Sequence, residues 1–185
     1  MKKLISLLLA MVMVFGLTAC GGNTEQPTEA ATEAPTGPLS GTLEELLAQV
    51  IEIQPVEFMG GSMTLDLTDT SEDGLWMVKN YTGLDNADSI KEAAFYEAMM
   101  GSIPYSMVMV RVADGADAAT VAAAMKSGID QRKWICVEAD DLKVSGKGDT
   151  VMLIMVDSEY KESISAASVT EAFKTVCGGS LDFEI

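Results

Sequence analysis

The stretch TVMLIMV, residues 150–156, decides the fold, because every residue after the threonine is apolar. Successive side chains of a strand point to opposite faces of its sheet. A strand that is apolar at both sets of positions is therefore covered on both sides. We expect residues 150–156 to form a central strand.

Four other stretches predict strands around this one. YSMVMVRVA, residues 105–113, is rich in valine. Residues 133–143 precede the central strand, and SGKGD, residues 145–149, is the expected turn between the two. The segment SIKEAAFYEAMM, residues 89–100, contains helix formers as well as two aromatic residues, and of helix and strand we favour a strand. A short strand is expected at residues 63–67.

Four helices are predicted from N-cap residues that precede helically spaced apolar positions. The caps, in chain order, are Thr42, Thr70 or Ser71, Asp117 and Ser168. Thr42 and Ser168 are each followed three residues later by a glutamate, which is the capping-box pattern. The expected stops, in the same order, are Pro55, Gly83 after a helix to about Asn80, Gly128 and Gly178.

These elements alternate hairpins with helices, which is typical of an antiparallel sheet with helices packed against it. The predicted class is α+β, a two-layer antiparallel sheet with helices packed on a face. Its β-β-α-β-β-α core follows an N-terminal helix, and residues 42–185 form one globular domain.

The N-terminus has the order of a bacterial export signal. Two lysines precede an apolar run at residues 4–15, and small residues then lead to Cys20. LTAC, residues 17–20, resembles the lipobox of bacterial lipoproteins. The resemblance implies cleavage after a signal peptide of residues 1–19 and a lipid on Cys20, which places the protein at the cell membrane on its extracytoplasmic face. The alternative is an ordinary signal peptide in which Cys20 has no role.

Residues 21–41, after the predicted lipidated Cys20, contain three prolines and a single large apolar residue. Such a segment buries too little apolar surface to offset its chain entropy. We interpret residues 20–41 as the lipidated cysteine and a flexible linker.

Charge and composition exclude several functions. The chain has 12 basic and 28 acidic residues, no histidine and a net charge of −16. Nucleic-acid binding is therefore not expected, because phosphate contacts need a basic patch. The lack of histidine removes Ser-His and Cys-His nucleophile pairs and the usual zinc ligand. We expect no cofactor.

The region from about residue 93 to 156 resembles a domain of unknown function found in lipoproteins of Gram-positive, mainly clostridial, bacteria. The similar segments are IPYSMVMVRVADGAD at 103–117, DQRKWICV at 130–137 and the hairpin at 145–156. The resemblance implies an exported, lipid-anchored α+β domain without a known activity or catalytic residue.

Three groups of residues are weak candidates for sites. Asp69, Ser71 and Asp73 match the first ligands of a calcium loop, but Asn80 stands where that loop needs glutamate, so a solvated acidic turn is favoured. The pair Cys136 and Cys177 forms either a disulfide or two packed thiols. The third group is Arg132, Lys133 and Trp134, which could form an interaction spot. The favoured alternative places Trp134 in the core and has Arg132 and Lys133 cap the preceding loop.

Methionines raise the possibility of a Cu(I) site, because two thioethers share a side of a strand in Met107-x-Met109. Met99-Met100 and the pair Met152 and Met155 are further candidates. Core packing by flexible side chains is the favoured interpretation.

The sequence thus favours a non-enzymatic, lipid-anchored interaction or accessory domain of the cell envelope, with an unknown envelope protein as partner. The alternative is a lipoprotein that binds a small ligand or a cation. A hydrolase that uses carboxylates alone is the third hypothesis.

Overall fold

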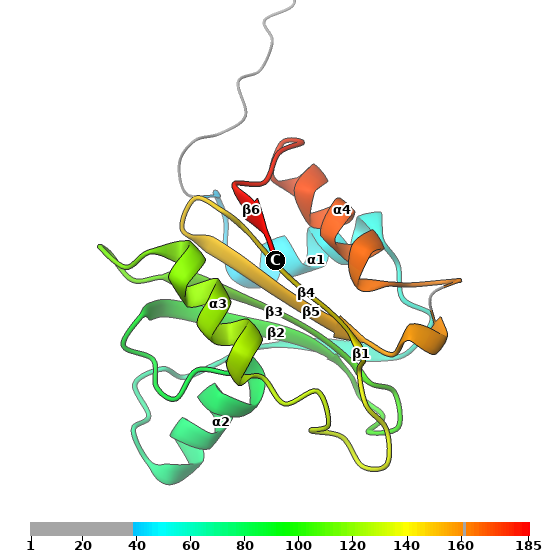
Figure 1. Cartoon of the computed structure of the whole chain (residues 1–185), viewed down its shortest axis with the longest axis horizontal. Helices are drawn as coiled ribbons and strands as arrows, with labels where there is room; N and C mark the ends of the chain where they lie inside the picture. The colour runs from blue at the N-terminus through cyan, green and yellow to red at the C-terminus, as the bar shows by residue number, and fades with distance from the viewer. Residues whose placement is uncertain (1–38, 161) are drawn as a thin grey trace, which may run out of the picture. The chain divides into compact units, whose positions relative to one another are not determined.

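A computed structural model describes residues 39–160 and 162–185. The predicted signal peptide, Cys20 and most of the predicted linker lie outside the described residues. The helices are α1 (Leu43–Ile53), α2 (Glu72–Thr82), α3 (Ala118–Gly128), the short 3₁₀ helix η1 (Ser158–Tyr160) and α4 (Ala166–Val176). The strands are β1 (Gly60–Thr64), β2 (Ile90–Ala98), β3 (Tyr105–Val112), β4 (Asp141–Lys147), β5 (Thr150–Val156) and β6 (Phe183–Glu184). Figure 1 shows their arrangement.

All six strands form one antiparallel sheet in the order β1-β2-β3-β5-β4-β6. Strand β5 lies between β3 and β4, with Leu153 opposite both Val108 and Val144. Every residue of β5 is buried. The predicted central strand is confirmed.

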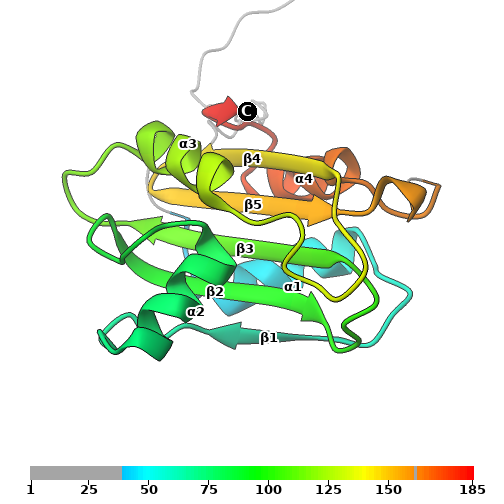
Figure 2. The ribbon, with the colours of Figure 1, turned by 60° about the horizontal axis from the view of Figure 1, so that its bottom comes forward.

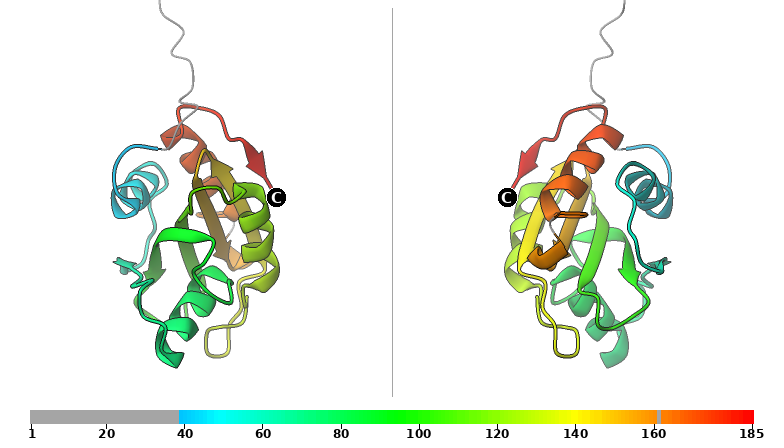
Figure 3. Two further views of the ribbon diagram at one scale, coloured as in Figure 1. Left: turned by 90° about the vertical axis from the view of Figure 1, so that its left-hand side faces the viewer. Right: turned by 90° about the vertical axis from the view of Figure 1, so that its right-hand side faces the viewer.

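The α+β class and the antiparallel sheet with packed helices are confirmed, and the helices cover both faces of the sheet. Helices α1 and α4 pack on one face, around Phe173. Helices α2 and α3 pack on the other, around Met125. Figures 2 and 3 show the sheet between these two layers of helices. Every residue of β3 and β5 is buried, so both faces of the sheet must be covered. This explains why a second layer of helices packs on the sheet.

The segment 89–100, open between helix and strand, forms β2. The first and third helices begin after the expected caps Thr42 and Asp117, and of the alternatives Thr70 and Ser71, Ser71 caps the second. The last begins three residues earlier than predicted, because Ser165 is its N-cap. Ser168 occupies N3 and takes the role of the capping-box glutamate, since its hydroxyl accepts from the Ser165 N–H at 3.0 Å.

The bounds of three predicted features of the sheet differ in the structure. Residues 133–140 lie outside the strands, and β4 begins only at Asp141. Strand β4 continues through most of the expected turn, which leaves Gly148 and Asp149 between β4 and β5. Strand β1 covers Gly60–Thr64 instead of 63–67, because pairing with β2 places Gly60 opposite Ala98.

The folded part of the chain extends into the predicted linker. Leu39 is buried in the core beside α1. The Gly41 carbonyl oxygen accepts a hydrogen bond of 2.6 Å from the Arg111 guanidinium. None of the helices in the described ranges is long and apolar enough to cross a membrane.

Candidate binding pocket

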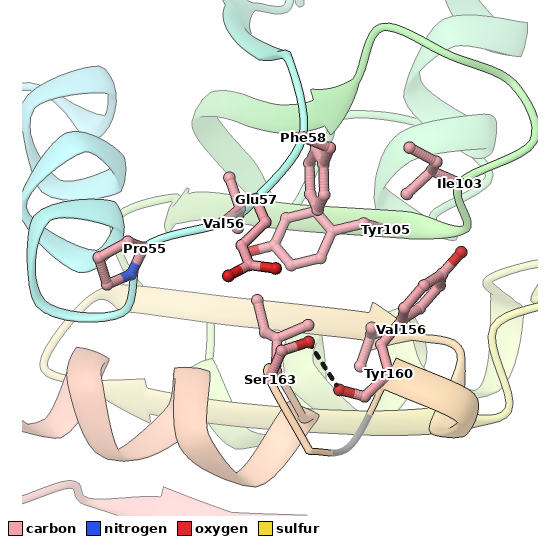
Figure 4. A pocket seen from close by; sticks show the side chains of 10 residues that line it. Pro55, Val56, Glu57, Phe58, Ile103, Tyr105, Val156, Tyr160 and Ser163 are labelled. Carbon is pink, nitrogen blue, oxygen red and sulfur yellow. Dashed lines mark hydrogen bonds between the residues drawn. The ribbon is translucent and has the colours of Figure 1, made fainter.

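An apolar pocket of about 210 Å³ lies at the end of the sheet where β3 begins and β5 ends. Five segments line it: the loop after α1, the β2–β3 connection, the start of β3, the end of β5, and η1 with its connection to α4. The lining residues are Pro55, Val56, Glu57, Phe58, Ile103, Tyr105, Val156, Tyr160, Ser163 and Ile164. Figure 4 shows these side chains gathered around the cavity.

Tyr105 is the most deeply buried polar residue of the pocket, with 1% of its surface exposed. Its ring lies 5.0 Å from that of Phe58 and meets Tyr96 edge-on at 6.2 Å. Its hydroxyl has no hydrogen-bond partner among the described residues. Burial raises the pKa of Tyr105 above its ordinary range. The hydroxyl therefore stays protonated at neutral pH and is free to donate a hydrogen bond.

The other polar groups of the pocket lie at its rim. The Glu57 side chain is exposed and brings a carboxylate to the opening. The Ser163 hydroxyl donates to the Tyr160 carbonyl oxygen at 3.1 Å, which fixes the loop on the other side (Figure 4). The pocket thus combines apolar walls with a buried hydroxyl at Tyr105 and an exposed carboxylate at Glu57.

The size of the pocket limits what it holds. Pockets for drug-sized ligands measure about 300–1,000 Å³, whereas an apolar cavity of about 150 Å³ binds benzene. At about 210 Å³, the space accommodates one aromatic ring or one branched aliphatic chain.

The three residues of the predicted interaction spot have different surroundings. Arg132 is exposed and pairs with Glu138. The Lys133 side chain is only 5% exposed, and its ammonium pairs with Glu97 on β2. It also lies 4.6 Å from the centre of the Tyr81 ring and 5.3 Å from that of Trp134, which is half-buried against the core. Lys133 is thus an internal cation, whereas Arg132 and Trp134 line a shared surface hollow with Cys136, Val137 and Glu138.

Lys133 also meets a possible nucleophile, since its ammonium lies 3.2 Å from the Ser106 hydroxyl. Burial lowers the pKa of Lys133, and Glu97 opposes this shift. A lysine beside a serine is one known arrangement for activating a hydroxyl. Here Ser106 is fully buried within β3, and none of the pockets we identify in the described residues reaches it.

The calcium-loop residues act in turns and a helix cap. The Asp69 carboxylate accepts from the Ser71 N–H at 2.9 Å, and the Ser71 hydroxyl accepts from Gly74 to cap α2. In the described residues no group of three acidic, cysteine or histidine side chains is placed to hold a metal ion.

The two cysteines of the domain are both free. Cys177 is fully buried beside α4, and Cys136 is exposed in the loop before β4. The disulfide alternative is therefore not realised in this structure. Burial raises the pKa of the Cys177 thiol to about 12.

No motif in the sequence predicted the pocket. The sequence feature that could have indicated it is the apolar pair Val56 and Phe58, just after Pro55 at the end of the first helix. Which other segments meet that pair depends on the order of the strands in the sheet. Searches against protein-family models, curated proteins and solved structures found no match to this chain.

Proposed function

We propose that this chain is a lipid-anchored protein of the extracytoplasmic membrane face, and that its domain binds an envelope partner without catalysis. The pocket at the start of β3 receives one aromatic or branched aliphatic side chain of that partner. The observation that supports this function is the pocket itself, with its apolar walls and its unpaired Tyr105 hydroxyl.

The surroundings of the pocket favour a large partner. Ile53, Met59 and Tyr160 are large apolar residues that are exposed at or beside the segments lining the opening. A small anchoring pocket within a wider apolar surface is the usual centre of a protein–protein contact. A partner with an aromatic anchor would bury both regions together.

A second candidate function is binding of a free small ligand, and the Tyr105 hydroxyl favours it. A buried donor without a partner raises the free energy of the empty site, and a ligand acceptor would remove this penalty. A ring-sized molecule with one acceptor, such as p-cresol, matches both the volume and the donor.

The test is an NMR titration of methyl groups in the pocket with toluene, p-cresol and isobutanol as probes. We expect the signals of Val156 and Ile164 to shift and saturate. Ser163→Phe should abolish the shifts by filling the opening. Ser127→Phe is the matched control, because Ser127 is also exposed and its hydroxyl also bonds a carbonyl three residues earlier at 3.1 Å.

Crosslinking in cells, with a photoreactive group at residue 163, then distinguishes the two candidate functions. A crosslink to one envelope protein that p-cresol suppresses favours the partner, and p-cresol binding without such a crosslink favours the ligand. If no probe shifts the methyl signals, or if Ser163→Phe binds as well as Ser127→Phe, the pocket is not the functional site.

A further inference from the structure

The methionines of the domain divide into two populations. Met107, Met109, Met152 and Met155 are fully buried, as expected for core packing. Another group is exposed where β1 begins and β2 ends: Met59 at 76%, Met99 at 72% and Met100 at 58%.

Backbone pairing brings two of the exposed methionines together. The Met99 N–H donates to the Met59 carbonyl oxygen at 2.9 Å, which continues the ladder beyond the pair Gly60 and Ala98. Directly opposed residues of an antiparallel pair have their Cβ atoms about 4.5–5.5 Å apart and on the same face. The thioethers of Met59 and Met99 therefore start from neighbouring positions.

Met100 adds a third thioether at the same corner. It begins the turn to β3, and its carbonyl oxygen accepts from the Ile103 N–H at 3.0 Å. This bond fixes the backbone beside Met99, while three rotatable bonds let each methionine side chain bring its sulfur towards a shared point. Figures 1 and 2 show the β2–β3 turn beside the start of β1.

The donor chemistry selects one class of ligand. Thioethers are neutral and soft, and they prefer Cu(I) and similar soft monovalent ions to calcium, magnesium or zinc. The chain has no histidine to favour a divalent ion, and its net charge of −16 attracts cations. We infer that Met59, Met99 and Met100 form a surface site for Cu(I) or Ag(I), beside the apolar pocket.

The test uses Ag⁺ as a redox-inert probe, in chloride-free buffer, on the full chain in detergent. Cys136→Ser is introduced first, because the exposed thiol of Cys136 would compete with the thioethers for the ion. We expect one Ag⁺ to bind by calorimetry, and Cu(I) to compete with it under anaerobic reduction. X-ray absorption on the Cu(I) form should show sulfur ligands alone.

Leucine replacements separate metal binding from apolar contact, because leucine keeps a similar size and loses the sulfur. Met59→Leu and Met99→Leu should each weaken Ag⁺ binding at least tenfold, and the triple variant with Met100→Leu should abolish it. Met63→Leu is the matched control, since Met63 is also exposed but lies four residues further along β1. If the triple variant binds like its parent, or if Met63→Leu weakens binding equally, the proposed site is wrong. An unchanged circular dichroism spectrum shows that each variant is folded.

Discussion

At the scale of single residues, Lys133 carries a charge on a side chain that is almost completely buried. Its ammonium leaves water to lie beside Glu97, Ser106 and two aromatic rings. Removal of a charge from water is costly, and a nearby opposite charge with good hydrogen bonds offsets most of that cost. Lys133 and Glu97 therefore depend on each other.

Lys133→Ala should lower the free energy of unfolding by about 3–5 kcal/mol, because Glu97 would stay buried without a counterion. The double variant Lys133→Met with Glu97→Gln should recover most of that loss. Urea unfolding at pH 7 measures both. Arg132→Ala is the control: Arg132 pairs with Glu138 at the surface, and such pairs contribute about 0–1 kcal/mol. Equal losses in Lys133→Ala and Arg132→Ala would contradict this account.

Cys177 should lower the free energy of unfolding of the domain as the pH becomes alkaline. The folded pKa is about 12, above the ordinary value of about 8.5 for a cysteine, so the unfolded chain ionises first as the pH rises. The stabilisation from the protonated thiol is complete below pH ~8.5 and declines between there and pH ~12.

The Cys177 contribution to stability, measured by urea, should thus fall from pH 8 to pH 10.5, and Cys177→Ala should remove that part of the pH dependence. Lys133, whose pKa is lowered by burial, acts in the opposite direction in both proteins. Tyr105, whose pKa is also raised by burial, adds to the decline only above its ordinary value of about 10. Cys136→Ser is the control, because it also removes one cysteine but at an exposed position outside the core. The same slope in Cys177→Ala and its parent would show that the buried thiol is not responsible.

At the scale of elements, two glycines set how closely α2 and α3 approach. Gly83 ends α2 with a left-handed backbone, at φ 78°. Gly128 is the last residue of α3, and a Cβ at that position would collide with the Gly83 carbonyl oxygen. The contact is between backbones, so neither a rotamer change nor a side-chain shift relieves it.

Gly128→Ala should destabilise the domain by more than about 1 kcal/mol, although alanine normally favours a helix over glycine by about that amount. Gly61→Ala on β1 is the control, because a Cβ there meets open space. Thermal unfolding of both variants measures the difference. A neutral or stabilising Gly128→Ala would mean that α2 and α3 can move apart freely.

At the scale of the whole molecule, the pocket and the point where the chain enters the domain lie at opposite ends of β3. Gly41 is bound by Arg111 near the last residue of that strand, and Tyr105 is its first. Arg111 lies six positions after Tyr105 along β3, which separates the two residues by about 20 Å. If Cys20 holds the lipid, the chain enters at one end of the domain and the pocket opens at the other.

Cys20→Ser should move the protein from the membrane fraction to the soluble extracytoplasmic fraction, because the lipid would then have no attachment site. Cell fractionation followed by immunoblotting measures the distribution. Cys136→Ser, which removes a cysteine of the folded domain, should stay with the membrane. Retention of Cys20→Ser in the membrane fraction would contradict the lipobox interpretation.

The sequence by itself determined the class of the fold and most of its elements. The all-apolar run at 150–156 required a central strand, and the caps Thr42, Ser71 and Asp117 began helices where expected. These features depend on neighbouring residues, whose hydrogen bonds and periodicity are visible along the chain.

Only the tertiary structure decided where residues 133–140 lie, how many layers cover the sheet and where the pocket is. Lys133 looked like a surface cation until Glu97, Tyr81 and Ser106 were placed around it by three other elements. The pocket likewise joins segments that are up to about a hundred residues apart, from Pro55 to Ile164. Such contacts depend on strand order, which residue spacing along one chain does not determine.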